Sequence, residues 1–156
     1  MRILAIDPGT EKSGWCLLDS GIVKESGVMP NRELLYVVGG WSHYSEDTLA
    51  IEMIASYGMA VGREVFETCV WVGRFQQAWR DPDSVRLVYR RDVKMHLCGT
   101  PKAKDANIRQ ALIDLIGPQG TKKAQGATYG VKSHAWAALG VAATVAGITP
   151  ESKRIG

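Results

Sequence analysis

The first stretch of the chain constrains the fold more than any other. Four consecutive apolar residues, 3–6, are followed by an acid, Asp7, and by the turn pair Pro8-Gly9. A short apolar run bounded by turn residues is typical of a fully buried strand. The chain then returns as a second apolar run over residues 14–18. Together the two runs predict an antiparallel hairpin that carries its acid near the mouth.

Asp7 and a second acid, Glu52, stand alone in apolar surroundings. A carboxylate at the end of a buried strand is costly unless a cation meets it. Asp7 therefore needs a metal ion or a basic partner, unless it only caps the turn. Glu52 interrupts the apolar run 48–54, where a glutamate is seldom left unpaired. Two such acids on two predicted central strands favour convergence on one cation.

Length and composition indicate one globular domain. A chain of 156 residues buries roughly two thirds of its unfolded surface, and we expect a single domain over residues 1–150 with a flexible tail over 151–156. No apolar run approaches the about 20 residues that span a bilayer, and the N-terminus shows no signal peptide. Three widely spaced cysteines without CxxC spacing argue against disulfides and zinc. We expect a cytoplasmic protein.

Charge is distributed unevenly between the two halves of the chain. Residues 1–85 contain 7 Lys/Arg and 12 Asp/Glu, a net −5, whereas residues 86–156 contain 12 and 4, a net +8. This asymmetry is expected where a metal site adjoins a phosphate-binding surface, although a chance distribution would look the same.

The rest of the chain alternates strands and helices. Three short runs over residues 2–28 predict an antiparallel meander. Asn31 is a candidate cap for a short helix that Gly39-Gly40 interrupts, and residues 42–47 have the composition of a loop. We further expect strands over 48–54 and 85–89, and helices over 58–79, 90–99, 105–116 and 131–145.

Helical spacing over residues 58–79 predicts an inward stripe and an outward face that carries Trp71. Trp71 is a candidate dimer contact, or it packs under a loop. The inward stripe comprises Val61, Val65, Cys69, Val72 and Gln76, with Gly62, Phe66 and Gly73 beside it.

Three features of the basic half are candidates for the site. Asp105 has two possible roles. It is suited to the first turn of a helix, which would be a purely structural role, or it binds a metal ion. The loop 119–130, with its lysines and Tyr129, is either a phosphate-binding loop or a solvated surface loop. His134 falls on the apolar face of the last helix, where it is a core residue or points toward the strand ends.

These motifs, taken together, resemble the RuvC family of Holliday-junction endonucleases, and most closely its phage-borne branch. The resemblance implies an RNase H-like α/β fold: a mixed five-stranded sheet in the order 3-2-1-4-5 with helices on both faces. The matching motifs are Ile-Asp-Pro-Gly-Thr and Gly-Trp within 6–15, Ala-Ile-Glu at 50–52, Arg-Arg-Asp-Val-Lys at 90–94, Lys-Ala-Lys-Asp-Ala-Asn at 102–107, and Ser-His-Ala-Trp-Ala-Ala-Leu at 133–139.

The resemblance also implies a set of metal ligands, from which this chain departs at one position. Asp7 and Glu52 match the family's first two metal-binding acids and His134 matches the third. Ala137 stands where the fourth acid is expected. Cleavage of this type uses two divalent ions roughly 4 Å apart, for which two carboxylates and an imidazole are few ligands. Asp105 supplies the missing oxygen, or Mn²⁺ replaces Mg²⁺, or the second metal site is weak or lost.

The implied activity is metal-dependent hydrolysis of Holliday junctions, forks or flaps, in which a water molecule attacks the phosphate in line and leaves a 5′-phosphate. Symmetric cutting of a four-way junction requires a homodimer, which we expect to use the helix over 58–79. We expect neither a membrane nor a nucleotide cofactor as partner. Basic residues would bind the DNA backbone, and Tyr129 would stack on an unpaired base. The expected DNA contacts are Arg90, Arg91, Lys102, Lys104, Lys122, Lys123, Tyr129 and Lys132.

Two other classes of function compete with this interpretation. The Asp-Pro-Gly-Thr turn also resembles the first phosphate loop of the actin and sugar-kinase superfamily. That superfamily needs two lobes and a second glycine-rich loop, which this chain lacks. The stronger alternative, suggested by Ala137, is a branched-DNA-binding module of the same fold that does not cleave.

Overall fold

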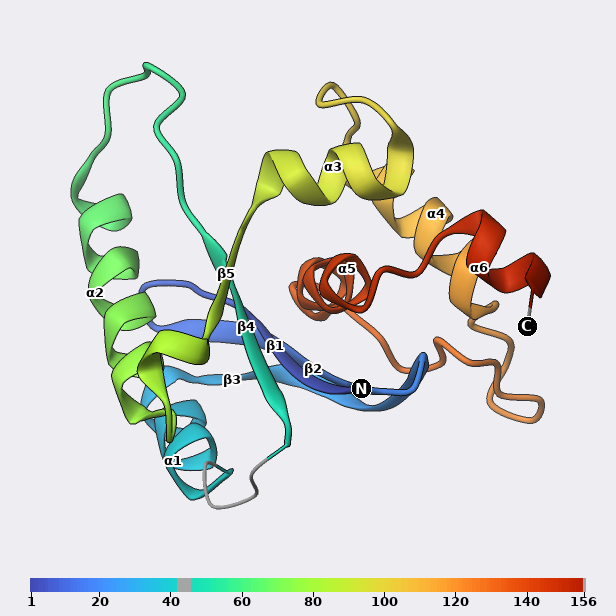
Figure 1. Ribbon diagram of the computed structural model, residues 1–156, viewed down its shortest axis with the longest axis horizontal. Coiled ribbons are helices and arrows are strands. Elements are labelled where there is room, and N and C mark those ends of the chain that lie inside the picture. Colours follow the sequence, from blue (N-terminus) through green and yellow to red (C-terminus); the bar gives the residue numbers. More distant parts are fainter. Residues whose placement is uncertain (42–45, 156) are drawn as a thin grey trace.

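A single mixed β-sheet forms the centre of the molecule (Figure 1). The computed structural model describes residues 1–41 and 46–155. In this part of the chain five strands lie in the order β3-β2-β1-β4-β5, which confirms the expected sheet. β1 pairs antiparallel with β2 and parallel with β4. The strands are β1 (Arg2–Asp7), β2 (Lys12–Asp19), β3 (Ile22–Pro30), β4 (Thr48–Met53) and β5 (Arg86–Tyr89).

Helices cover both faces of the sheet. α1 and α2 lie on one face, and α3, α4 and α5 lie on the other (Figure 1). α5 is apolar on every side and is buried between the sheet and its neighbours in that layer. The elements are α1 (Asn31–Trp41), α2 (Arg63–Ala78), the short 3-10 helix η1 (Pro82–Ser84), α3 (Arg90–Cys98), α4 (Asp105–Ile116), α5 (Ala135–Ala146) and α6 (Pro150–Ile155).

Alternation along β1 divides the core in two. Leu4 and Ile6 pack toward α1 and α2, whereas Ile3 and Ala5 pack toward α5. Because side chains alternate along a strand, Asp7 lies on the same side of β1 as Ile3 and Ala5 and faces the layer of α3, α4 and α5.

No helix in the described residues is long and apolar enough to cross a membrane.

Three local predictions are wrong. α1 continues through Gly39-Gly40 instead of being interrupted there, because its buried face makes up for the poor helix propensity of glycine. α2 begins at Arg63 and not at residue 58. Its inward face carries Thr68, Val72 and Phe75, so the predicted stripe is rotated, and Gly62, Phe66 and Gly73 are exposed. The predicted loop over 42–47 lies mostly outside the described residues.

Trp71 is partly buried against the core and not on an outward face. Its ring lies 5.8 Å from that of Phe75, and the guanidinium of Arg74 stacks 4.0 Å from its centroid. At the C-terminal end, residues 151–155 of the expected flexible tail lie in the short helix α6 (Pro150–Ile155).

Candidate active site at the ends of β1 and β4

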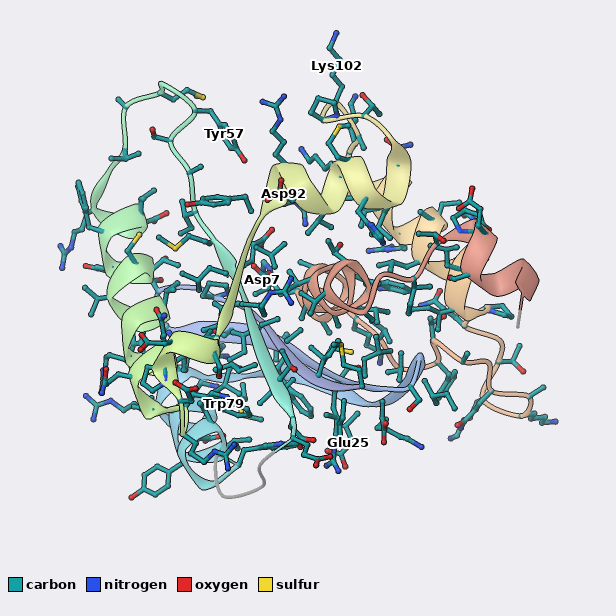
Figure 2. All side chains as sticks on the ribbon, in the orientation of Figure 1. Asp7, Glu25, Tyr57, Trp79, Asp92 and Lys102 are labelled. Carbon is teal, nitrogen blue, oxygen red and sulfur yellow. The ribbon has the colours of Figure 1, made fainter. Side chains whose placement is uncertain are left out.

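Asp7 and Glu52 meet at the ends of two neighbouring parallel strands. Ile6 of β1 pairs with Ile51 of β4, so Asp7 and Glu52, which follow them, lie at the same level on the two strands. The two carboxyl groups are within hydrogen-bonding reach of each other. Figure 2 shows Asp7 at the centre of the molecule, beside α5. The structure therefore brings together the two acids that the sequence singled out.

The environment of this pair disfavours two negative charges. Burial raises the pKa of Glu52 from 4.5 to about 8; the adjacent Asp7 adds to the shift and Arg90 opposes it. Burial also raises the pKa of Asp7. The Oε1 atom of Glu52 is buried and has no hydrogen-bond partner. Without a cation the buried pair therefore favours protonation, and a cation would relieve the repulsion and give the unpaired oxygen a partner.

His134 completes the cluster from the start of α5. Its Nδ1 atom lies 3.0 Å from Oδ2 of Asp7, and its side chain is 70% exposed. The prediction that His134 lies on the packing face, one turn inside a helix that begins at 131, is wrong, because α5 begins at Ala135. Ser133 before it has a φ of 52°, a backbone conformation that often marks functional sites.

Gly14 allows His134 to approach the sheet. Gly14 pairs with Asp7 across β1 and β2. A Cβ atom at Gly14 would lie 2.4 Å from the carbonyl oxygen of His134, a severe clash. The Gly-Trp pair of the sequence motif thus has a physical role, because only glycine leaves room for the chain that carries the histidine.

A buried polar network holds the turn that follows Asp7. Oγ of Ser13 donates to Oδ1 of Asn31 (2.6 Å) and accepts from the backbone N–H of Gly9 (3.2 Å). Nδ2 of Asn31 donates to the carbonyl oxygen of Gly9 (2.9 Å). Asn31, the first residue of α1, thereby ties this helix to the turn and fixes the direction in which Asp7 leaves the strand. The sequence had suggested only a helix cap at Asn31.

Arg90 connects the acid pair to Asp105. Arg90 is the first residue of α3 and directly follows Tyr89, which pairs with Met53 of β4. Its Nη1 atom lies 3.6 Å from Oε1 of Glu52, and Nη2 forms an ion pair with Oδ1 of Asp105. Asp105 occupies the first turn of α4, the structural role that the sequence predicted for it. Its carboxylate is already paired with the guanidinium of Arg90.

Three cavities adjoin this cluster. Ala137, Asp105, Arg90 and His134 contribute to a cavity of about 250 Å³. His134 also borders a groove of about 570 Å³ between the β1–β2 turn and α2, whose lining includes Lys12. Arg90 also borders a cavity of about 220 Å³, whose other lining residues are Tyr57, Arg91, Lys94 and Pro101.

The expected DNA contacts fall into three groups. Arg90 and Arg91 line the cavity of about 220 Å³. Figure 2 shows Lys102 projecting from the α3–α4 loop at the periphery, with Lys104 at the start of α4 and exposed Lys132 just before His134. The loop over 117–130 projects from the opposite side of the molecule from the β4–α2 loop (Figure 1). Lys122, Lys123 and Tyr129 belong to that loop.

The sequence reasoning did not include Tyr57 or Lys94 among the site residues. Both line the cavity of Arg90, and Figure 2 shows Tyr57 on the β4–α2 loop with its ring directed toward α3. Tyr57 has a φ of 51°. A lone aromatic residue shortly after the Glu52 strand was the available signal for Tyr57, and the spacing of Lys94 one helical turn after Arg90 was the signal for Lys94.

Two solved structures share this architecture. A structure of Thermus thermophilus RuvC matches with a TM-score of 0.69 and 17% sequence identity over 94% of each chain. The chain has the RuvC fold. A second structure, T. thermophilus RuvC in complex with a Holliday junction substrate, matches with a TM-score of 0.65 and 16% identity, covering 94% of this chain and 93% of that chain. No protein-family model and no curated protein sequence matches the chain. The expected RNase H-like fold class is thereby confirmed.

The residues at the site suit one divalent cation better than two. Asp7 and Glu52, whose Oε1 atom has no hydrogen-bond partner, offer the negative charge that one cation needs. Mg²⁺ is often held by one or two carboxylates and water. Among the described residues no group of three or more His, Cys, Asp and Glu side chains is arranged to hold a metal. A second ion would have Ala137 in place of an acid, and Asp105 paired with Arg90.

Proposed function

We propose that this protein is a cation-dependent endonuclease that hydrolyses phosphodiester bonds in branched DNA, four-way junctions above all. The observation that carries the proposal is the buried pair of Asp7 and Glu52, whose charge calls for a cation, in a chain with the RuvC fold. A similar structure holds a Holliday junction, which supports this substrate class. The motif spacing of the sequence favours the phage-borne branch of that family.

In this proposal Asp7 and Glu52 hold the cation, Mg²⁺ or Mn²⁺, which when bound lowers the pKa of water and neutralises phosphate charge. Hydrolysis joins the oxygen of water to phosphorus and breaks the P–O3′ bond. The products are a 5′-phosphate and a 3′-hydroxyl, whose oxygen takes up a proton. Because Nδ1 of His134 contacts Asp7, Nε2 is the nitrogen that can ligate the cation or receive the proton of the attacking water.

The cavities beside the acids provide a path for a DNA strand. The groove that contains Lys12 shares His134 with the cavity of Ala137, and that cavity shares Arg90 with the one lined by Arg91 and Lys94. Cations on this path would hold backbone phosphates without reading sequence. Each phosphate contact should therefore make the slope of log K against log salt concentration more negative by about 0.9. The remaining expected contacts are Lys102, Lys104 and Lys132, with Lys122, Lys123 and Tyr129 directed to another arm of the junction.

A second copy of the chain is part of the proposal, because two symmetric cuts require a twofold assembly. α2 presents Phe66 and Val70, which are 61% and 62% exposed and one turn apart. Their replacement by Glu and Lys should convert a dimer to a monomer in light scattering coupled to size exclusion. Tyr36→Glu is the matched control, because Tyr36 is an exposed aromatic residue on the neighbouring helix α1.

The decisive experiment measures cleavage of a labelled four-way junction with Mg²⁺ or Mn²⁺. Asp7→Asn and Glu52→Gln should each abolish cleavage and leave junction binding in EDTA. Asp19→Asn is the control, because Asp19 ends the neighbouring strand β2 opposite Arg2, away from the site. Cleavage by both Asp7→Asn and Glu52→Gln at the unaltered rate would refute the proposal.

A branched-DNA-binding module that does not cleave is the second candidate, favoured by Ala137 in the cavity beside His134. Such a protein would bind a four-way junction in EDTA and produce no nick with any divalent ion. The junction assay with the unaltered protein therefore separates the two candidates.

A further inference from the structure

The place where a second cation would be expected carries an arginine. Arg90 reaches both acids that flank this place: Nη1 lies 3.6 Å from Oε1 of Glu52, and Nη2 is ion-paired with Asp105. The first contact is too long for a hydrogen bond, and Oε1 of Glu52 has no other partner. The guanidinium thus lies between two carboxylates without fully satisfying the buried one.

The backbone of Arg90 is held at this place by the fold. Met53 of β4 pairs with Tyr89 of β5, and Arg90 begins α3 immediately afterwards. Val93, one turn later, is completely buried against α5. The base of the Arg90 side chain is therefore held beside the end of β4, the strand that carries Glu52.

The surrounding cavity lacks the ligand that a second ion requires. Arg90, Asp105 and Ala137 line the same space of about 250 Å³. The methyl group of Ala137 offers no oxygen, and the nearby carboxylate of Asp105 is matched by Arg90. A second divalent ion here would meet a fixed positive charge instead of a carboxylate, and the two cations would repel each other.

We propose that Arg90 takes the place of the second cation, so that the site works with one divalent ion and one guanidinium. This inference rests on the proposed nuclease function. When a DNA strand enters, the fork of N–H groups donates hydrogen bonds to the non-bridging oxygens of the scissile phosphate, a geometry that guanidinium matches well. Arg90 transfers no proton. It stabilises the negative charge that grows on the phosphate and on the departing 3′ oxygen.

The first test counts bound ions on the full chain without DNA, by equilibrium dialysis against Mn²⁺. The unaltered protein should bind one ion per chain. Ala137→Asp restores the missing carboxylate but leaves the guanidinium, and should still bind one. The double variant Arg90→Gln/Ala137→Asp removes the charge and adds the ligand, and should bind two. Circular dichroism and thermal melting establish that each variant is folded.

The second test measures single-turnover cleavage of a labelled junction. Arg90→Gln should keep its one ion and its junction affinity in EDTA within a few-fold, and should lose cleavage by about 10²–10³-fold, as is typical when one charge-stabilising donor is removed. Arg90→Lys should recover part of the rate. The rate should depend on the first power of Mn²⁺ concentration in the unaltered protein and on the second power in the double variant. Arg86→Gln is the control, because Arg86 is an exposed arginine on β5.

The outcomes separate this inference from the function on which it rests. Two ions bound by the unaltered protein would overturn the inference alone, and so would cleavage by Arg90→Gln within threefold of the unaltered rate. Failure of the unaltered protein to cleave any branched DNA would refute the nuclease function itself.

Discussion

Nδ1 of His134 lies 3.0 Å from Oδ2 of Asp7, although 127 positions separate the two residues in the chain. The contact joins the first strand to the start of α5. It is possible because Gly14, the residue of β2 that pairs with Asp7, has no side chain to obstruct His134. The site is thus assembled from the two ends of the domain, and its geometry depends on how α5 lies on the sheet.

Replacement of His134 by Ala should reduce junction cleavage by about 10²–10⁴-fold, the range for loss of a proton-transfer group. Because the side chain is 70% exposed, the free energy of unfolding should change by less than about 0.5 kcal/mol. Single-turnover kinetics and urea denaturation measure the two effects. His96→Ala should lower the free energy of unfolding and leave cleavage unchanged. His96 forms a 2.8 Å hydrogen bond with the carbonyl oxygen of Ile148 and does not touch the acids. Equal loss of activity in both variants would contradict the role of His134.

The acid pair should make the stability of the cation-free protein depend on pH. Burial raises the pKa of Glu52 from 4.5 to about 8, so between these values the folded state keeps a proton that the unfolded state releases. The free energy of unfolding should therefore fall as pH rises through this window, by at most about 1.4 kcal/mol per pH unit. Thermal melts in EDTA across the window test this expectation.

Glu52→Gln supplies the control for the pH experiment, because the amide does not titrate. The difference in melting temperature between the unaltered protein and this variant should shrink or reverse as pH rises. Saturating Mn²⁺ should remove the loss of stability at high pH in the unaltered protein only, because the cation replaces the proton on the acid pair. A difference that stays constant with pH would show that Glu52 has an ordinary pKa.

Gly14→Ala should damage the site through the backbone of His134. The added Cβ would lie 2.4 Å from that carbonyl oxygen and 2.7 Å from the Cβ of His134, so the start of α5 must move. We expect a loss of about 1–3 kcal/mol in stability and a large loss of cleavage. Gly40→Ala is the contrasting change, because nothing lies within 4 Å of the new Cβ on α1, and it should stabilise the protein by about 0.5–1 kcal/mol. Denaturation and cleavage assays on both variants test this.

Asn31→Ala should weaken the turn after Asp7. The side chain is buried and bonds both Ser13 and Gly9, so its removal leaves unpaired polar groups at a cost of about 1–3 kcal/mol. The affinity for Mn²⁺ should fall as well, because Asp7 follows the turn. Asn107→Ala, which removes an exposed helix-capping contact on α4, should cost about 1 kcal/mol and leave the Mn²⁺ affinity unchanged. Calorimetric titration with Mn²⁺ distinguishes the two.

The acids could be found from the sequence because their signal is local. Asp7 and Glu52 each interrupt or end a short apolar run, and a charged residue in such a run demands a partner wherever the strand is placed. The boundaries of α3 and α4 were equally accessible, since Gly99 and Gly117, both at positive φ, end them.

The contacts that complete the site depend on tertiary packing and carry no local signal. The apolar spacing of the last helix placed His134 inside it, but the helix starts one residue later, after a left-handed residue at Ser133. The pairing of Arg90 with Asp105 depends on the angle between α3 and α4. The rotation of α2, which buries Phe75 and exposes Phe66, follows from its packing against α1 and the sheet.

The position of α5 has a consequence for how the protein is made. One face of β1 and β2 stays bare until this helix, which follows all five strands in the chain, has left the ribosome. A nascent chain therefore contains Asp7 and Glu52 long before His134 can reach Asp7. Chains truncated before α5 would present an apolar face of the sheet to the cell's proteases.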